Sequence, residues 1–346
     1  MSFRSIPLAF VLLLLCACST TSRYRIIAYA FNDTDIPRMG AEKLTHINYA
    51  FGLVSTDGLI VLDEKAPPRL AQLGALKTKN PQLKILLSVG GWGADHFSDA
   101  ALTDASREKF ATSALDVLRE HRLDGIDLDW EYPGQPGPGI KYRAEDKQNF
   151  TLMLKALREK LGDAYLITIA SSAGEYFEHT EMDRLHVYLD WINIMTYDFA
   201  GEWTPTTGHH SALHGDGLSA ASFVRQHLDA GIPPSKIVMG VPFYGRGWTG
   251  VNPLNNGFNQ PYAKAIEVSW SGMAAQSGER LWDDEAQAPY VWDAQSTTFI
   301  SYDDPRSLRV KADFIRKHRL GGVMYWEHSQ DPDEELLSVL AESLQR

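Results

Sequence analysis

Three carboxylates alternate along one short segment of the chain, at Asp127, Asp129 and Glu131. Because side chains alternate between the two faces of a β-strand, these three would point the same way, about 6–7 Å apart along the backbone. Like charges on one face of a buried strand repel each other and lose their hydration, which is costly unless the groups share protons. We therefore predict that this row of carboxylates performs chemistry.

Proton transfer is the chemistry that such a row favours. Burial and neighbouring carboxylates raise the pKa of an acid, and a glutamic acid with a raised pKa can donate its proton to a leaving oxygen near neutral pH. Glu131 comes last, at the expected end of the strand, so we predict that it is the proton donor and that Asp127 and Asp129 support it. Asp124 has the opposite strand parity and is interpreted as structural support. A Ca²⁺ or Mg²⁺ site is the alternative, although the sequence lacks the glycine and the longer ligand series of an EF-hand loop.

The elements that would position these groups are strands alternating with helices. Eight apolar, β-rich runs predict strands at Arg25–Ala30, His46–Phe51, Lys84–Val89, Asp124–Trp130, Leu166–Ala170, Trp191–Tyr197, Lys236–Val241 and Gly322–Trp326. Apolar residues at three- and four-residue spacing predict helices between most of them, at Ser106–His121, Lys147–Leu161, Ala220–Ala230 and Pro305–His318, with a last helix at Asp333–Leu344.

This alternation predicts a closed (β/α)8 TIM barrel, whose active site lies at the carboxyl ends of the strands. Residues 247–300 break the rhythm with scattered aromatic residues, prolines and short strand-like runs. A structureless loop of this length is improbable, so we predict a small α+β insertion there, between strand seven and helix seven. The barrel would then comprise residues 25–246 and 301–346.

Four further motifs lie at the ends of other predicted strands. They are Ser88-Val-Gly-Gly-Trp92, Met195-Thr-Tyr-Asp198, Tyr244-Gly-Arg246 and Gly322-Val-Met-Tyr-Trp326. Together with Asp124-x-x-Asp127-x-Asp129-x-Glu131, and in this order, they resemble the signature of glycoside hydrolase family 18, the chitinase family. The insertion after strand seven resembles the subfamily that carries an α+β insertion there.

The resemblance implies a substrate-assisted mechanism that retains the anomeric configuration. The acetamido carbonyl of the substrate attacks the anomeric carbon, while Glu131 protonates the leaving oxygen and later activates water. Asp129 would orient the acetamido N–H, and Asp127 would hold Asp129 and share its proton. Tyr197 would hydrogen-bond the acetamido oxygen, and Trp326 would form the floor under the sugar.

Other residues match the family at binding positions, and the family needs no cofactor. Tyr29 and Phe51 would wall the cleavage subsite, and Trp92 and Trp203 would stack on sugars on the leaving side and nearby. The expected sugar contacts are Met195, Asp198, Tyr244 and Arg246, and Ser88 is expected to give structural support.

One cluster of possible metal ligands lies after the sixth predicted strand, at His209, His210, His214 and Asp216. Zinc sites use such residues, but their spacing fits no helix-borne pair of ligands. We therefore expect no metal.

A formal net charge of -11 argues against a nucleic-acid partner, because phosphates would be repelled. We expect a monomer.

Residues 1–17 resemble a bacterial lipoprotein signal, with a basic Arg4, an apolar run from Ile6 to Leu15, and Cys18 as the lipidated residue. An ordinary cleaved signal peptide is the alternative.

Residues 18–24 would then be a tether. The protein would be exported and anchored to a bacterial membrane by its lipid, in the outer membrane if the source is Gram-negative, because Ser19 follows the cysteine. Both cysteines, Cys16 and Cys18, lie in this region, so we expect no disulfide inside the fold.

The leading hypothesis is therefore cleavage of chitin or chitooligosaccharides. Two alternatives remain open: a non-catalytic chitin-binding lectin on the same barrel, and an endo-β-N-acetylglucosaminidase acting on glycans or peptidoglycan fragments.

Overall fold

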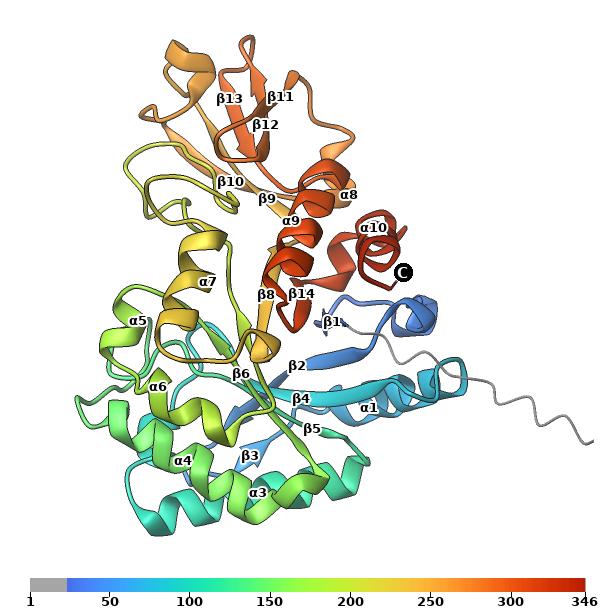
Figure 1. The fold of residues 1–346 in the computed structure, drawn as a ribbon, viewed down its shortest axis with the longest axis vertical. Coiled ribbons are helices and arrows are strands. Elements are labelled where there is room, and N and C mark those ends of the chain that lie inside the picture. Colours follow the sequence, from blue (N-terminus) through green and yellow to red (C-terminus); the bar gives the residue numbers. More distant parts are fainter. Residues whose placement is uncertain (1–23, 346) are drawn as a thin grey trace, which may run out of the picture.

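Eight parallel strands close into a barrel in the computed structural model, which describes residues 24–345. Their order around the barrel is β1, β14, β8, β7, β6, β5, β4 and β2, and pairing of β1 with β2 closes it (Figure 1). The bounds are β1 Arg25–Ala30, β2 His46–Val54, β4 Lys84–Gly90, β5 Gly125–Asp129, β6 Leu166–Ser171, β7 Trp191–Ile194, β8 Ile237–Pro242 and β14 Gly322–Trp326. A short strand β3 (Ile60–Val61) pairs antiparallel with β2.

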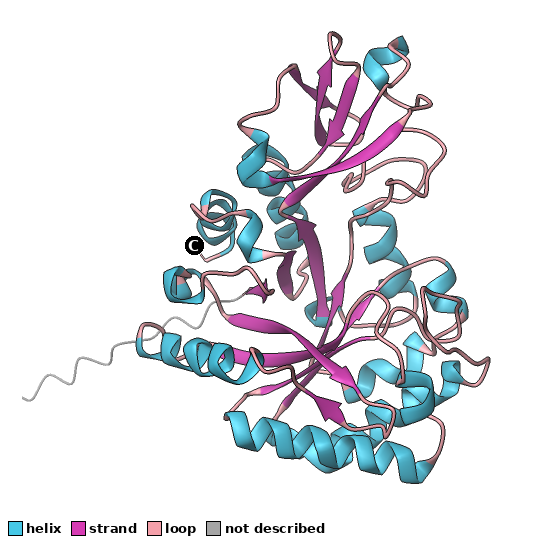
Figure 2. Ribbon diagram, turned by 180° about the vertical axis from the view of Figure 1, so that it is seen from behind, coloured by secondary structure: helices cyan, strands magenta, loops and turns pink. Residues whose placement is uncertain are grey.

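Helices surround the barrel, as the turned view of Figure 2 shows. They are α1 Ala66–Ala75, α3 Asp104–His121, α4 Asp146–Leu161, α7 Ala220–Asp229, α9 Pro305–His318 and α10 Glu335–Leu344, with short helices α2 Phe97–Ala100, α5 Glu175–Glu178 and α6 Met182–Leu185. Because helices cover their outer faces, the strands are buried on both sides; β5, for example, is buried at every position. The predicted (β/α)8 barrel is confirmed.

Two predicted strands end earlier in the structure than the sequence suggested. β5 stops at Asp129, so Glu131 lies in the loop two residues beyond it. β7 stops at Ile194 rather than Tyr197, because the chain turns there and the amide of Thr196 binds the carbonyl of Ile194. Tyr197 and Asp198 therefore leave the ladder, and Asp198 adopts a left-handed backbone conformation with φ 59°.

Between β8 and α9 the chain builds a separate five-stranded antiparallel sheet, seen at the top of Figure 1. Its order is β10 (Lys264–Ser269), β9 (Tyr244–Thr249), β13 (Thr298–Ser301), β12 (Ala288–Asp293) and β11 (Glu279–Asp283), with the short helix α8 (Trp270–Met273) after β10. A small core of its own includes Trp248, Trp292 and Phe299. We call this unit the inserted sheet. It begins at Tyr244 rather than at residue 247, so Tyr244 and Arg246 belong to the sheet and not to the barrel.

The expected signal segment 1–17, the lipidation site Cys18 and residues 18–23 of the expected tether lie outside the described residues. Across residues 24–345 we find no helix with the length and apolar character needed to cross a membrane.

Candidate active site

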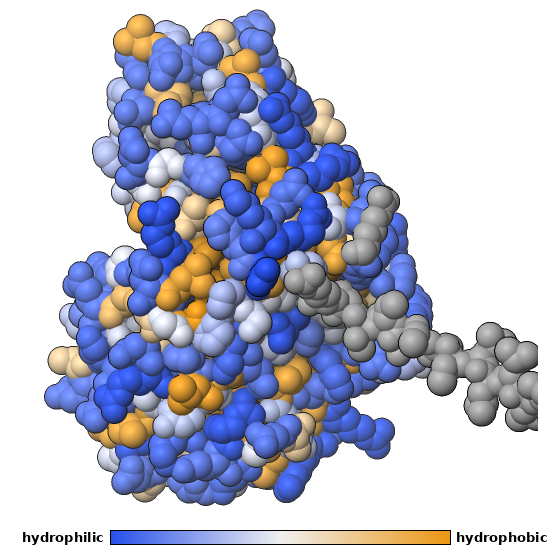
Figure 3. All heavy atoms as spheres, in the orientation of Figure 1, coloured by the Kyte–Doolittle hydropathy of each residue, from blue (hydrophilic) through white to orange (hydrophobic). Residues whose placement is uncertain are grey.

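A cleft with a volume of about 1220 Å³ lies at the carboxyl ends of the barrel strands. Figure 3 shows hydrophobic side chains gathered where the inserted sheet meets the barrel. The volume exceeds that of pockets that hold a drug-sized ligand. The cleft brings together every residue that the sequence predicted to face a substrate, namely Tyr29, Phe51, Trp92, Asp129, Glu131, Met195, Tyr197, Asp198, Trp203, Tyr244, Arg246 and Trp326.

Asp127 lies beneath this cleft and is completely buried. Its Oδ2 accepts hydrogen bonds from Tyr29 Oη and Ser88 Oγ, both at 2.8 Å, and its Oδ1 accepts from Thr168 Oγ1 at 2.5 Å and Asn193 Nδ2 at 3.1 Å. The four donors come from β1, β4, β6 and β7. Burial raises the pKa of Asp127, whereas these hydrogen bonds oppose the increase.

Asp129 is 5% exposed and lies between Asp127 and Glu131 in the row. Burial raises its pKa well above the ordinary value, and the negative charges of Glu131 and Asp127 add to this effect. Its Oδ1 is buried and has no hydrogen-bond partner within the described part of the chain. Such an oxygen is costly unless a ligand or a shared proton satisfies it.

Glu131 is the carboxylate above Asp129 in the cleft. Burial raises its pKa from 4.5 to about 7; a hydrogen bond from Tyr132 opposes this increase and the charge of Asp198 adds to it. A carboxyl group of this kind holds its proton in slightly acidic solution and loses it in basic solution. This is the ionisation that a general acid, and then a general base, requires near neutral pH.

Two glycines let the backbone approach the carboxylate row closely. A Cβ on Gly90 would lie 2.0 Å from the carbonyl oxygen of Asp129, and a Cβ on Gly91 would lie 2.7 Å from the ring of Phe51. Both glycines have positive φ values, 122° and 94°. Their place in the motif before Trp92 therefore has a steric reason.

The floor of the cleft is an aromatic cluster around Trp326. The ring of Phe51 stacks on Trp326 with centroids 5.6 Å apart and an interplanar angle of 22°. Tyr29 and Phe31 contact the same indole at 5.6 and 5.7 Å. Tyr197 also faces the cleft, and burial followed by the charge of Asp129 raises its pKa, so its hydroxyl remains a hydrogen-bond donor.

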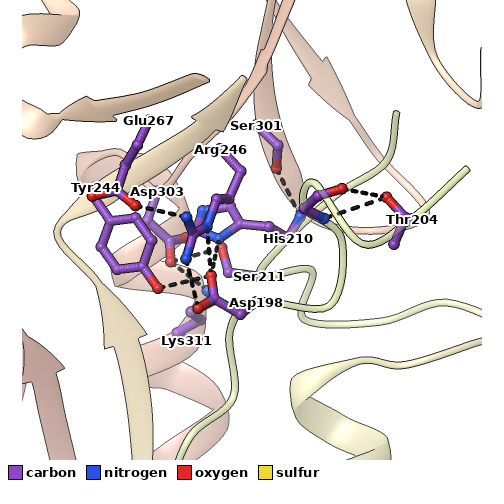
Figure 4. Close-up of polar contacts among 11 residues, drawn as sticks. Asp198, Thr204, His210, Ser211, Tyr244, Arg246, Glu267, Ser301, Asp303 and Lys311 are labelled. Carbon is purple, nitrogen blue, oxygen red and sulfur yellow. Dashed lines mark hydrogen bonds and ion pairs between the residues drawn. The ribbon is translucent and has the colours of Figure 1, made fainter. Parts of the chain in front are cut away.

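Asp198 connects the barrel with the inserted sheet, as Figure 4 shows. Its carboxylate accepts a hydrogen bond from Tyr244 Oη at 2.8 Å and two from Arg246, both at 2.9 Å. Arg246 also donates to Glu267 at 2.6 Å. Burial alone would raise the pKa of Asp198, but contacts with His210 and Arg246 hold it far below its ordinary value.

Two tryptophans stay exposed in the cleft, Trp92 at 67% and Trp203 at 55%. Trp92 contacts Tyr132 edge-on with centroids 6.2 Å apart, and the Arg246 guanidinium lies 5.3 Å from the centroid of Trp203. Large exposed rings that line a cleft provide flat apolar surfaces for a ligand.

The remaining predicted residues lie away from the cleft. Asp124 accepts hydrogen bonds from Lys77 at 2.6 Å, from Lys84 at 3.3 Å and from the amide of Ile85 at 2.8 Å, which ties the start of β5 to β4. Ser88 contacts Asp127 and not the open cleft. Both placements are those of structural residues.

The three histidines of the suspected metal cluster diverge. His209 contacts Asp283 of the inserted sheet at 3.1 Å, His210 lies beside Asp198, and His214 packs against Phe314 of α9. Within residues 24–345, no group of three or more His, Cys, Asp or Glu side chains is placed to hold a metal ion.

The sequence reasoning missed several residues of the site. Phe31 follows Ala30 at the end of β1, and its position directly after a strand could have identified it. Thr168 and Asn193 are inward-facing polar residues in otherwise apolar strands, a pattern that indicates a buried polar partner. Glu267 carried no local signal, because only the fold of the inserted sheet brings it to Arg246.

Comparisons with known proteins agree with this geometry. Residues 18–331 match glycosyl hydrolases family 18. Chitinase A1 of Niallia circulans is 41% identical over 317 residues, which cover 82% of this chain but only 45% of that protein. Chitinase B of Serratia marcescens is 31% identical, covering 90% of this chain and 78% of its own.

A solved structure supports the same conclusion. The family 18 N-acetylglucosaminidase from Paenibacillus barengoltzii superimposes with a TM-score of 0.87 at 41% identity, covering 93% of this chain and 100% of that one. Together, the match along most of the chain and the shared barrel assign the protein: it belongs to glycosyl hydrolase family 18.

Proposed function

We propose that the protein hydrolyses β-1,4-linked N-acetylglucosamine chains, chitin or chitooligosaccharides, with retention of anomeric configuration. The observation that carries the proposal is the buried Oδ1 of Asp129, next to Glu131 in the carboxylate row, which has no hydrogen-bond partner among residues 24–345. An acetamido N–H is a donor that would satisfy this oxygen. The named chitinases among the relatives support the same substrate class.

The first step of the reaction breaks the glycosidic bond. Glu131 gives its proton to the glycosidic oxygen, which leaves with the bonding electron pair. The carbonyl oxygen of the substrate's own acetamido group bonds to the anomeric carbon from the opposite face, which forms an oxazolinium ion. Asp129 accepts a hydrogen bond from the acetamido N–H and stabilises the positive charge, and the Tyr197 hydroxyl donates a hydrogen bond to the acetamido oxygen.

The second step regenerates the enzyme. The Glu131 carboxylate removes a proton from water, and the resulting hydroxide attacks the anomeric carbon from the face that the leaving group vacated. The carbon–oxygen bond of the oxazolinium breaks and restores the acetamido group. Two inversions give net retention. Trp326 and the rings around it provide the apolar surface beneath the distorted sugar.

Hydrolysis of a defined N-acetylglucosamine hexamer by the soluble domain tests this function, with a Glu131→Gln variant beside it. We expect the wild type to release β-anomers early in the reaction and the variant to lose at least about a thousandfold in kcat, because the proton donor is gone. Binding of the hexamer without cleavage by either protein would instead favour a lectin.

The lengths of the products distinguish two modes of action. The Paenibacillus barengoltzii relative is described as an N-acetylglucosaminidase, so release of single sugars from one end is a specific second candidate. Mixed short oligomers would indicate internal cleavage. Equal activity on a hexamer lacking N-acetyl groups would contradict the substrate-assisted mechanism.

We further propose that the protein acts as a monomer that is exported and anchored to a bacterial membrane by a lipid on Cys18. The support is the apolar run Ile6–Leu15 before Leu15-Cys16-Ala17-Cys18, and the family match that begins only at residue 18. A Cys18→Ala variant should lose incorporation of labelled palmitate and leave the membrane fraction. Unchanged labelling of that variant would contradict the anchor, and sedimentation of the soluble domain as a dimer would contradict the monomer.

A further inference from the structure

His210 is the one fully buried histidine in contact with the charged cluster of the cleft, among the residues that the structure describes. Its Nδ1 lies 3.6 Å from Asp198 Oδ1, and its ring packs against Tyr244 with centroids 5.3 Å apart. Neither ring nitrogen has a hydrogen-bond partner within residues 24–345. A buried imidazole in this condition requires an explanation.

The backbone holds this ring at Asp198. The amide of Phe199, the residue after Asp198, binds the carbonyl of His210 at 3.0 Å, and the amide of His210 binds Ser301 Oγ of β13 at 3.0 Å. Asp198 has a left-handed backbone, a conformation that is uncommon for residues other than glycine although aspartate adopts it more readily than most. The segment around His210 therefore fixes the backbone of Asp198 as well as lying beside its carboxylate.

A second anchor lies behind His210. Ser211 Oγ donates to Asp303 Oδ2 at 3.1 Å, and Lys311 Nζ of α9 donates to the same oxygen at 2.5 Å (Figure 4). Asp303 and Lys311 are each only 1% exposed. Because this ion pair is buried, it restricts the position of Ser211, and with it the neighbouring ring of His210.

We propose that His210 is a positioning residue for the hydrolytic reaction: together with Tyr244 and Arg246 it holds the Asp198 carboxylate in place, and through Asp198 it sets the negative field that Glu131 experiences. The inference rests on the function proposed above. The other charged or titratable groups around His210 are Arg246 and Tyr244 on β9, His209 beside it in the chain, and Asp303 with Lys311 behind it. Tyr244 and Arg246 Nε donate to Asp198 Oδ1, the same oxygen that His210 Nδ1 approaches, so His210 completes the set of groups around that oxygen.

The test compares His210→Leu with two matched variants, using the hexamer and a full pH profile of kcat. Leucine fills similar space but removes the polar ring nitrogen that approaches Asp198. We expect kcat/KM to fall roughly tenfold. We also expect the basic limb of the profile to move up by on the order of half a pH unit, because a less compensated Asp198 favours protonated Glu131.

His210→Asn places an amide nitrogen near the position of Nδ1, and it should restore both the rate and the limb. His209→Leu is the matched control, because His209 is also buried but faces Asp283 and Phe258 of the inserted sheet. It should lower Tm without moving the limb. The inference would be overturned if the basic limb of the kcat profile stayed in place in His210→Leu, or if it moved by the same amount in His209→Leu. Failure of the wild type to cleave the hexamer would instead refute the proposed function.

Discussion

At the residue scale, Glu131 should determine how activity depends on pH. Burial raises its pKa to about 7, so the fraction of protonated acid falls as pH rises through that value. We predict that the basic limb of the pH profile lies near pH 7, and that above this pH kcat declines tenfold per pH unit. Initial rates between pH 4 and 9 check this. A basic limb below pH 5 would show that Glu131 titrates as an ordinary exposed acid.

The same ionisation predicts a dependence of stability on pH. Between 4.5 and about 7 the folded state binds more protons at Glu131 than the unfolded state does, so the free energy of unfolding falls as pH rises through this window. Glu131→Gln removes this effect. We expect the variant to be more stable than the wild type at pH 8, by on the order of 3 kcal/mol. The difference should shrink toward pH 4 in urea titrations, and a difference independent of pH would contradict this explanation.

Asp127 should stabilise the folded protein as well as support the reaction. In Asp127→Asn the new amide N–H group would face at least one of the four groups that donate to Asp127, so that two donors would meet. We therefore predict a loss of about 3 kcal/mol in the free energy of unfolding. Thr168→Val removes only one of the hydrogen bonds and should cost about 1 kcal/mol. Urea denaturation measures both. Equal losses would contradict the expected clash between the asparagine amide and the donors around it.

At the scale of elements, helix α9 joins the inserted sheet to the barrel. Asp304 caps its first turn by accepting from the amide of Ser307, and Pro305 occupies the first helical position. Capping residue, proline and apolar spacing are all local signals. The sequence therefore predicted the bounds of this helix, Pro305–His318, without error.

The ion pair between Lys311 of α9 and Asp303 in the preceding loop had no local signal in the sequence. Lys311→Met would leave Asp303 buried without its cation, and we predict a loss of about 3–5 kcal/mol. The double change with Asp303→Asn keeps an acceptor for Ser211 and Ser307 and should recover more than half of this loss. Thermal unfolding of the two variants measures it. No recovery in the double variant would indicate that the lysine stabilises through packing alone.

Element ends were also the least predictable part of the catalytic strands. Apolar content predicted where β5 and β7 begin, within one residue. It could not predict that β7 ends at Ile194, because Met195 and Tyr197 are residues that strands accept. What ends the strand is a turn whose side chains face the cleft, and that is a property of the tertiary structure.

At the scale of the whole molecule, the cleft is shared by two units, the barrel and the inserted sheet. Local motifs identified the residues predicted to face a substrate, because most of them lie at the end of a strand, but they missed other lining residues such as Phe31, Leu53 and Leu218. They could not identify the contacts across the two units, such as Arg246 with both Asp198 and Glu267. Those contacts depend on how residues 244–301 fold as a sheet.

A cleft of this size predicts a dependence on chain length. Trp203 is exposed in the cleft. Trp203→Ala should lower kcat/KM for a hexamer roughly tenfold, because a large aromatic contact with the substrate is lost. A chromogenic disaccharide too short to reach this ring should be cleaved at the wild-type rate. Comparing the two substrates with one variant provides the measurement, and equal losses on both would place Trp203 at the reaction centre instead.

The hydrogen bonds to Asp127 also bear on when the chain becomes active during its synthesis. The donors extend from Tyr29 in β1 to Asn193 in β7, so the carboxylate row acquires its supports only after most of the barrel has assembled. A nascent chain would hold the three carboxylates without their partners. Hydrolytic activity would then appear together with barrel closure, and a refolding chain could be followed by its turnover as directly as by its fluorescence.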